Sequence, residues 1–70
     1  MNEMELRAEL ARQGYTVPTF SSAIGISKKA GYEKVKGVTN FTQAELVKAK
    51  HVLNLDNDRF MTIFFASEVS

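Results

Sequence analysis

The stretch "TVPTFSSAIGISKKAGYEKVKG", residues 16–37, contains two short helix patterns separated by a glycine. Thr16 is a suitable N-cap for the first helix, and Pro18 falls in its first turn, where the missing N–H costs nothing. Ser27 is a suitable N-cap for the second helix, and Gly37 is a typical residue to end it. The stretch therefore predicts a helix-turn-helix pair whose second helix is basic.

The sequence before this stretch predicts another helix. In residues 2–14, Leu6 and Leu10 lie four apart and form one apolar face. Arg7 and Glu9 are expected to point away from that face. The pattern ends at a glycine, the residue type best able to follow a helix.

Two more helix patterns follow the helix-turn-helix. Thr42 and Glu45 form a capping box, with apolar residues at helical spacing behind them. Asp56 is a suitable N-cap for a last helix. A helix is the better interpretation of "FMTIFF", residues 60–65, although this segment is also a good strand former. The final residues, 66–70, are expected to fray.

The composition narrows the class of protein. The chain has 70 residues, 44% of them hydrophobic, and no cysteine, so packed apolar side chains must stabilise it. The absence of cysteine fits an intracellular protein. No run of about 18 apolar residues is present for a membrane span, and the acidic N-terminus is unlike a signal peptide. We therefore expect a cytoplasmic protein with no membrane partner.

Positive charge is concentrated in the middle of the chain. The net charge is −1 over residues 1–24, +4 over residues 25–50 and −2 over residues 51–70. A cluster of lysines on one segment is the pattern expected of a face that binds a polyanion.

The order of residues in and after the helix-turn-helix carries a family resemblance. The positions concerned are Thr16, Phe20, Ser21, Gly25, Ile26, Ser27, Val35, Gly37, Thr39, Asn40 and Phe41. This order resembles the phage Cro and repressor type of helix-turn-helix domain, the XRE family, over roughly residues 6–65. The resemblance implies an all-α, five-helix, lambda-repressor-like domain over residues 1–70, with the helix-turn-helix at about 16–37. It also implies a homodimer that binds a near-palindromic operator in double-stranded DNA, with recognition helices about 34 Å apart.

Two positions depart from the family's pattern. Position 17, commonly a Gln that contacts a phosphate, is Val17, so that contact is absent or is supplied by Thr16 and Thr19. Position 31, commonly Leu or Ile, is Gly31, although it is expected to share the core face of its helix with Val35. Either a neighbour such as Phe20 or Phe41 fills the gap that Gly31 leaves, or this helix packs more loosely.

The basic helix has an outward face suited to DNA. Lysine can donate to the O6 and N7 atoms of guanine, a tyrosine can contact a thymine methyl group, and a glutamate can accept from the cytosine amine. The residues expected to read bases are Lys28, Lys29, Tyr32 and Glu33. The residues expected to hold phosphates, which fix register without reading sequence, are Thr16, Ser27, Lys36, Thr39 and Asn40. A short lysine-rich helix is also an ordinary solvated face, so this assignment depends on the helix-turn-helix.

The last helix pattern has more apolar surface than one core face needs. Phe60, Ile63 and Phe64 form one stripe, and Met61 and Phe65 form another. Either both stripes belong to the core, or Met61 and Phe65 form a dimer contact, since exposed apolar patches commonly mark interfaces.

No residue pattern indicates catalysis. His51 is the only histidine and has no cysteine partner, so a metal site is not expected. No nucleophile triad, glycine-rich phosphate loop or pair of carboxylates in a cleft can be assembled, and no cofactor or small-molecule ligand is expected.

The expected function is therefore sequence-specific DNA binding by a small phage or prophage transcriptional regulator, a Cro-like repressor associated with the bacterial nucleoid when bound. The alternative is a helical protein-interaction module, such as an antitoxin-like or anti-repressor partner, with a vestigial helix-turn-helix. Val17 and Gly31 favour that alternative.

Overall fold

The computed structural model describes residues 1–65 and contains, within them, five α-helices and no strand. The helices are α1 (Glu3–Arg12), α2 (Val17–Ala23), α3 (Lys28–Lys36), α4 (Gln43–Val52) and α5 (Asn57–Phe64). The prediction of an all-α chain with five helices is confirmed, and residues 57–64 are helical rather than extended. The expected fraying of residues 66–70 lies outside the described residues.

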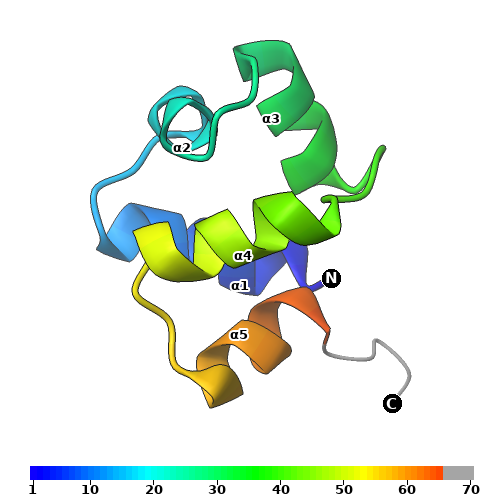
Figure 1. Ribbon diagram of the computed structural model, residues 1–70. Coiled ribbons are helices and arrows are strands. Elements are labelled where there is room, and N and C mark those ends of the chain that lie inside the picture. The colour runs from blue at the N-terminus through cyan, green and yellow to red at the C-terminus, as the bar shows by residue number, and fades with distance from the viewer. Residues whose placement is uncertain (66–70) are drawn as a thin grey trace.

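The helices occupy distinct parts of the molecule. α2 and α3 lie together at the top of Figure 1, α5 lies at the opposite end, and α1 and α4 lie between them. The N-terminus meets α5, where the Asn2 N–H donates to the Ile63 carbonyl at 2.8 Å. None of the helices in residues 1–65 is both long enough and apolar enough to cross a membrane.

Every helix begins with a side-chain cap. In each case the cap side chain accepts from the backbone N–H three residues later, which satisfies a donor that the helix itself leaves free. The five caps are Asn2, Thr16, Ser27, Thr42 and Asp56. All but Asn2 are caps that the sequence predicts, because capping depends only on residues a few positions apart.

The turn between α2 and α3 is fixed by backbone hydrogen bonds. Gly25 has a φ of +83°, its N–H donates to the Ser22 carbonyl at 3.1 Å, and the Ile26 N–H donates to the Ser21 carbonyl at 2.9 Å. This Schellman pattern needs a residue in the left-handed conformation, which glycine adopts without strain. The chain therefore leaves α2 in a defined direction and enters α3 two residues later.

Asn54 ends α4 in the same way. It has a φ of +51°, and the Leu55 N–H donates to the Lys50 carbonyl at 3.0 Å. Asparagine is the residue other than glycine that most often takes this conformation. Sequence reasoning overlooked this signal, although the residue type was visible.

The core takes apolar side chains from all five helices and from the α4–α5 connection. The buried apolar residues are Leu6, Leu10, Phe20, Ile24, Val35, Ala49, Leu53, Leu55, Ile63 and Phe64. Phe41, in the loop after α3, links two parts of this core: its ring centroid lies 6.4 Å from that of Phe20 and 5.5 Å from that of Phe64. The loop is therefore anchored in the core at this residue.

Gly31 lies where α2 and α3 pack most closely. Gly31 is buried, and a Cβ at this position would overlap with Ser21 Oγ and lie 2.8 Å from Ser21 Cβ. Ser21 is fully buried, and its hydroxyl donates to the Val17 carbonyl at 2.7 Å. Ser21, and not Phe20 or Phe41, therefore fills the space beside Gly31, and the alternative that this helix packs more loosely is wrong.

The prediction that Glu9 points away from the core is also wrong. Its side chain is 9% exposed and lies between α1 and α5. Arg59 donates to Glu9 at 3.0 Å, and Gln13 donates both to Glu9 at 2.7 Å and to the Leu53 carbonyl at 2.8 Å. A buried carboxylate is stable here because charged and amide donors satisfy it.

Candidate nucleic-acid interface

Three lysines on α3 point into solvent. Lys28, Lys29 and Lys36 are all exposed, and within residues 1–65 none of them forms an ion pair. Tyr32 lies one turn after Lys28 and is 40% exposed. The outward face of α3 is therefore cationic, with one accessible aromatic ring.

Glu33 is less accessible than its neighbours on this face. It is half-buried, and its backbone carbonyl accepts from the Val38 N–H at 2.9 Å and the Thr39 N–H at 3.3 Å, at the end of α3. The cationic residues therefore dominate the exposed surface of the helix.

Two of the predicted phosphate residues are helix caps. Ser27 Oγ accepts from the Ala30 N–H at 3.1 Å, which leaves the hydroxyl hydrogen free to donate to an external anion. Thr16 Oγ1 accepts from the Thr19 N–H at 3.2 Å and lies 3.1 Å from Thr19 Oγ1. Thr19 Oγ1 donates its own hydrogen to the Thr16 carbonyl, so in the pair of hydroxyls Thr16 is the donor. The Thr16 hydroxyl hydrogen is therefore used within the capping box. Ser27 is the better placed of the two for phosphate.

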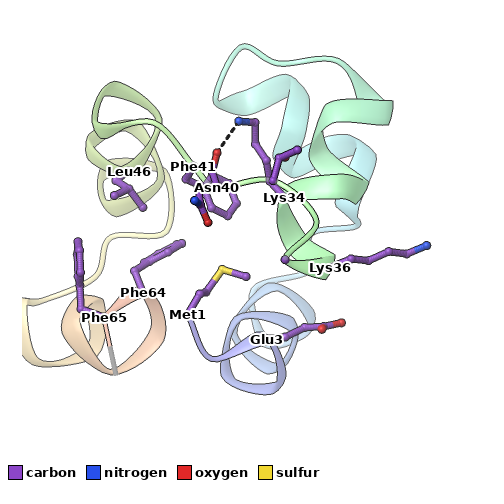
Figure 2. Close-up of a pocket in the computed structure, with 11 residues that line it drawn as sticks. Met1, Glu3, Lys34, Lys36, Asn40, Phe41, Leu46, Phe64 and Phe65 are labelled. Atoms are coloured by element: carbon purple, nitrogen blue, oxygen red, sulfur yellow. Dashed lines mark hydrogen bonds between the residues drawn. The ribbon is translucent and has the colours of Figure 1, made fainter. Parts of the chain in front are cut away.

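The other predicted phosphate residues lie at the end of α3 and after it. Lys36, Thr39 and Asn40 are all exposed. Figure 2 shows the Lys36 side chain extending away from Met1 and Phe64. Ser27 and this group therefore lie at opposite ends of α3, with Lys28, Lys29 and Tyr32 between them along the chain.

Two lysines counted in the basic segment are held by the protein itself. Lys34 pairs with Glu45 at 2.9 Å, and Lys50 donates to Asn57 Oδ1. Their ammonium groups are therefore less available to an external anion than those of Lys28, Lys29 and Lys36.

Lys48, on α4, is an exposed lysine that sequence reasoning did not assign. Its Nζ lies 3.6 Å from the position that a Cβ on Gly25 would take, so it is next to the α2–α3 turn. It adds positive charge near the start of α3. The only sequence signal was its membership of the basic segment, because the approach of α4 to this turn is a tertiary feature.

A groove of about 430 Å³ lies beside the α3–α4 loop. Figure 2 shows Met1, Phe41, Leu46 and Phe64 around its apolar part, and Lys34 hydrogen-bonded to Asn40 at its edge. The apolar part continues to Phe65.

The two stripes of α5 have different environments. Ile63 and Phe64 are buried and Phe60 is half-buried, whereas Met61 is 53% exposed and Phe65 is 52% exposed. The interpretation that both stripes belong to the core is therefore wrong, and Met61 and Phe65 form an accessible apolar pair.

A cluster of charged residues between α1 and α5 has a structural role. Hydrogen bonds from Gln13, and then from Arg12 and Arg59, lower the pKa of Glu9 from 4.5 to about 2, although burial acts in the opposite direction. Hydrogen bonds to Glu9 and then to Glu5 raise the pKa of Arg59. His51 is exposed, and residues 1–65 contain no group of three His, Cys, Asp or Glu side chains that could hold a metal.

The fold and this surface define a small all-α domain with an exposed basic helix. Comparisons with protein-family models, curated proteins and solved structures gave no match.

Proposed function

We propose that this chain is a small Cro-like transcriptional regulator that binds double-stranded DNA with α3 in the major groove. The observation that carries the proposal is the set of three exposed lysines on α3, Lys28, Lys29 and Lys36, none of which has an anionic partner in residues 1–65. Unpaired cations on one helix attract a polyanion, because neutralising phosphates releases condensed counterions.

The distribution of side chains along α3 supports a division of roles. An α-helix is about 10–12 Å across and enters a major groove about 12 Å wide. In this arrangement Lys28, Lys29 and Tyr32 meet base edges, while Ser27 at one end and Lys36 at the other hold phosphates. Thr39 and Asn40 extend the phosphate contacts into the following loop.

Fluorescence anisotropy on a selected duplex and on random duplexes, between about 50 and 200 mM salt, tests this proposal. We expect Lys29→Ala to cost about 1–3 kcal/mol on the selected site and to relax the preference at one base pair. We expect Lys36→Ala to weaken binding equally on all sequences and to lower the salt slope by about one per subunit.

Arg7→Ala is the matched control, because it removes one positive charge from an exposed position on α1. It should leave both the preference and the salt slope close to those of the unmodified chain. Binding that does not depend on salt, or that survives the loss of both lysines unchanged, would rule out α3 as the DNA-binding element.

A second candidate is a protein-interaction module. The observation in its favour is the exposed pair formed by Met61, on α5, and Phe65, directly after it, together with Val17 in place of the Gln typical of the resembled family. If the chain binds no duplex at low salt, this candidate replaces the first.

A further inference from the structure

Lys34 differs from the other lysines of α3 in what it contacts. Its side chain is only 13% exposed, and its Nζ lies 2.9 Å from Glu45 Oε1. The same Nζ donates to the Asn40 carbonyl at 2.9 Å, a bond drawn in Figure 2. A single side chain of α3 therefore holds both the loop after the helix and the first turn of α4.

Glu45 extends this network into the loop. Its Oε1 accepts from the Thr42 N–H at 2.9 Å, and Thr42 Oγ1 accepts from the Glu45 N–H at 3.2 Å. The hydrogen bond from the Thr42 backbone and the contact with Lys34 lower the pKa of Glu45, so the carboxylate is charged at neutral pH. The loop is consequently tied at Asn40 and at Thr42 to one ion pair.

Phe41 anchors the loop from its other side. Its ring packs edge-on against Phe20 of α2 and Phe64 of α5, and the Lys34 Nζ lies 6.0 Å from its centroid. The backbone at Asn40 is therefore held by the hydrogen bond from Lys34 and by the packing of the next residue, Phe41. The Asn40 side chain remains exposed.

We propose that Lys34 is a positioning residue, which holds residues 38–42 so that Thr39 and Asn40 meet the DNA backbone without Lys34 itself contacting a phosphate. This proposal rests on the proposed DNA-binding function. An ammonium group has three N–H donors, and that of Lys34 already bonds a carboxylate and a carbonyl, which leaves little for an external anion. The exposed ammonium group of Lys36 has all three donors available.

The first experiment compares salt slopes. Lys34→Met keeps an unbranched side chain one atom shorter and removes the charge. We expect it to weaken DNA binding by about tenfold, the effect of one lost charged hydrogen bond, with an unchanged salt slope. Lys36→Ala should instead lower the slope by about one. Lys34→Arg, which keeps a cation that can bond Glu45, should restore most of the affinity.

Glu45→Gln separates positioning from simple electrostatics. It keeps an oxygen for the Thr42 N–H but removes the anion, so it makes the chain more positive. Positioning predicts weaker DNA binding in this variant, as in Lys34→Met. A direct electrostatic role predicts tighter binding.

Amide hydrogen exchange in the free protein provides a readout that needs no DNA. We expect Lys34→Met to speed exchange at Thr39 and Thr42, whose N–H groups are hydrogen-bonded at the two ends of the loop, by about tenfold. Exchange at Leu53, in the core, should not change, which separates local loosening from loss of global stability.

A lowered salt slope in Lys34→Met together with tighter binding by Glu45→Gln would overturn the proposal, and so would unchanged exchange at Thr39 and Thr42. If the unmodified chain binds no DNA, the proposed function fails by itself. The exchange data then still decide whether Lys34 holds the loop.

Discussion

At the scale of single residues, Gly31 decides how closely α2 and α3 approach. A side chain at this position meets Ser21, which is fully buried and therefore has no free direction in which to move. We expect Gly31→Ala to lower stability by about 1–2 kcal/mol, because overpacking outweighs a gain in helix propensity of about 1 kcal/mol. Gly31→Leu should cost more. Urea denaturation measures both.

The control for this prediction is a double variant that changes both residues. Ser21→Gly with Gly31→Ala removes the Ser21 Cβ and Oγ that a new methyl would meet. The double variant should therefore lose less free energy of unfolding than the two single variants lose when their losses are added. A higher denaturation midpoint in Gly31→Leu would show that space exists beside α3 and would contradict the observed packing.

Glu9 makes stability depend on pH. Its pKa is lowered from 4.5 to about 2 in the folded chain, so its contribution is fully present above about pH 4.5 and is lost as the pH falls toward 2. We expect Glu9→Gln to be less stable than the unmodified chain at pH 7, by at most about 3 kcal/mol. Most of the difference should be lost by about pH 2, where Glu9 is about half protonated and its protonated form resembles glutamine.

Denaturation midpoints of both chains at pH 7, 4 and 2 would measure this difference. Glu3→Gln is the control, because the pair that Glu3 forms with Arg7 is exposed, and such pairs contribute about 0–1 kcal/mol. A gap between the Glu9→Gln variant and the unmodified chain that stays constant with pH would show that the carboxylate charge is not what stabilises this site.

At the scale of elements, α5 has one face in the core and one apolar pair in solvent. Met61 and Phe65 are each about half exposed, and the Phe65 ring lies 5.5 Å from that of Phe60. If this pair is a dimer contact, Phe65→Glu should yield a folded monomer with weakened operator affinity, because burying a carboxylate in an apolar interface is costly. Analytical ultracentrifugation would measure the change.

Two further variants control for the added charge and for the loss of the ring. Ala11→Glu adds the same charge at an exposed position on α1, and Phe65→Leu keeps an apolar side chain. Both should remain dimeric. A monomeric unmodified chain at concentrations well above those of DNA binding would contradict the assignment of this pair as a dimer contact.

At the scale of the whole molecule, the charged groups are divided between two functions. Glu5, Glu9 and Arg59 connect α1 with α5, where Arg59 bonds both carboxylates at 3.1 and 3.0 Å. Lys28, Lys29 and Lys36 lie on α3, with no such partners in the described residues. The charges that stabilise the fold are therefore separated from those proposed to bind DNA.

The sequence by itself determined where four of the five described helices begin. Thr16, Ser27, Thr42 and Asp56 were readable as caps because a cap bonds an N–H only three residues away. The same locality made most of the exposed face of α3 predictable, since helical periodicity turns Lys29 and Lys36 away from Val35. Such features need no knowledge of distant residues.

Only the tertiary structure decided how residues far apart in the chain share space. The sequence does not show that Ser21 fills the position beside Gly31, that Lys34 pairs with Glu45, or that Glu9 is buried against Arg59. Each of these contacts joins different helices, so its existence depends on how those helices pack. The reason is physical: a hydrogen bond or a packing contact acts over a few ångströms, and folding alone brings such atoms within that range.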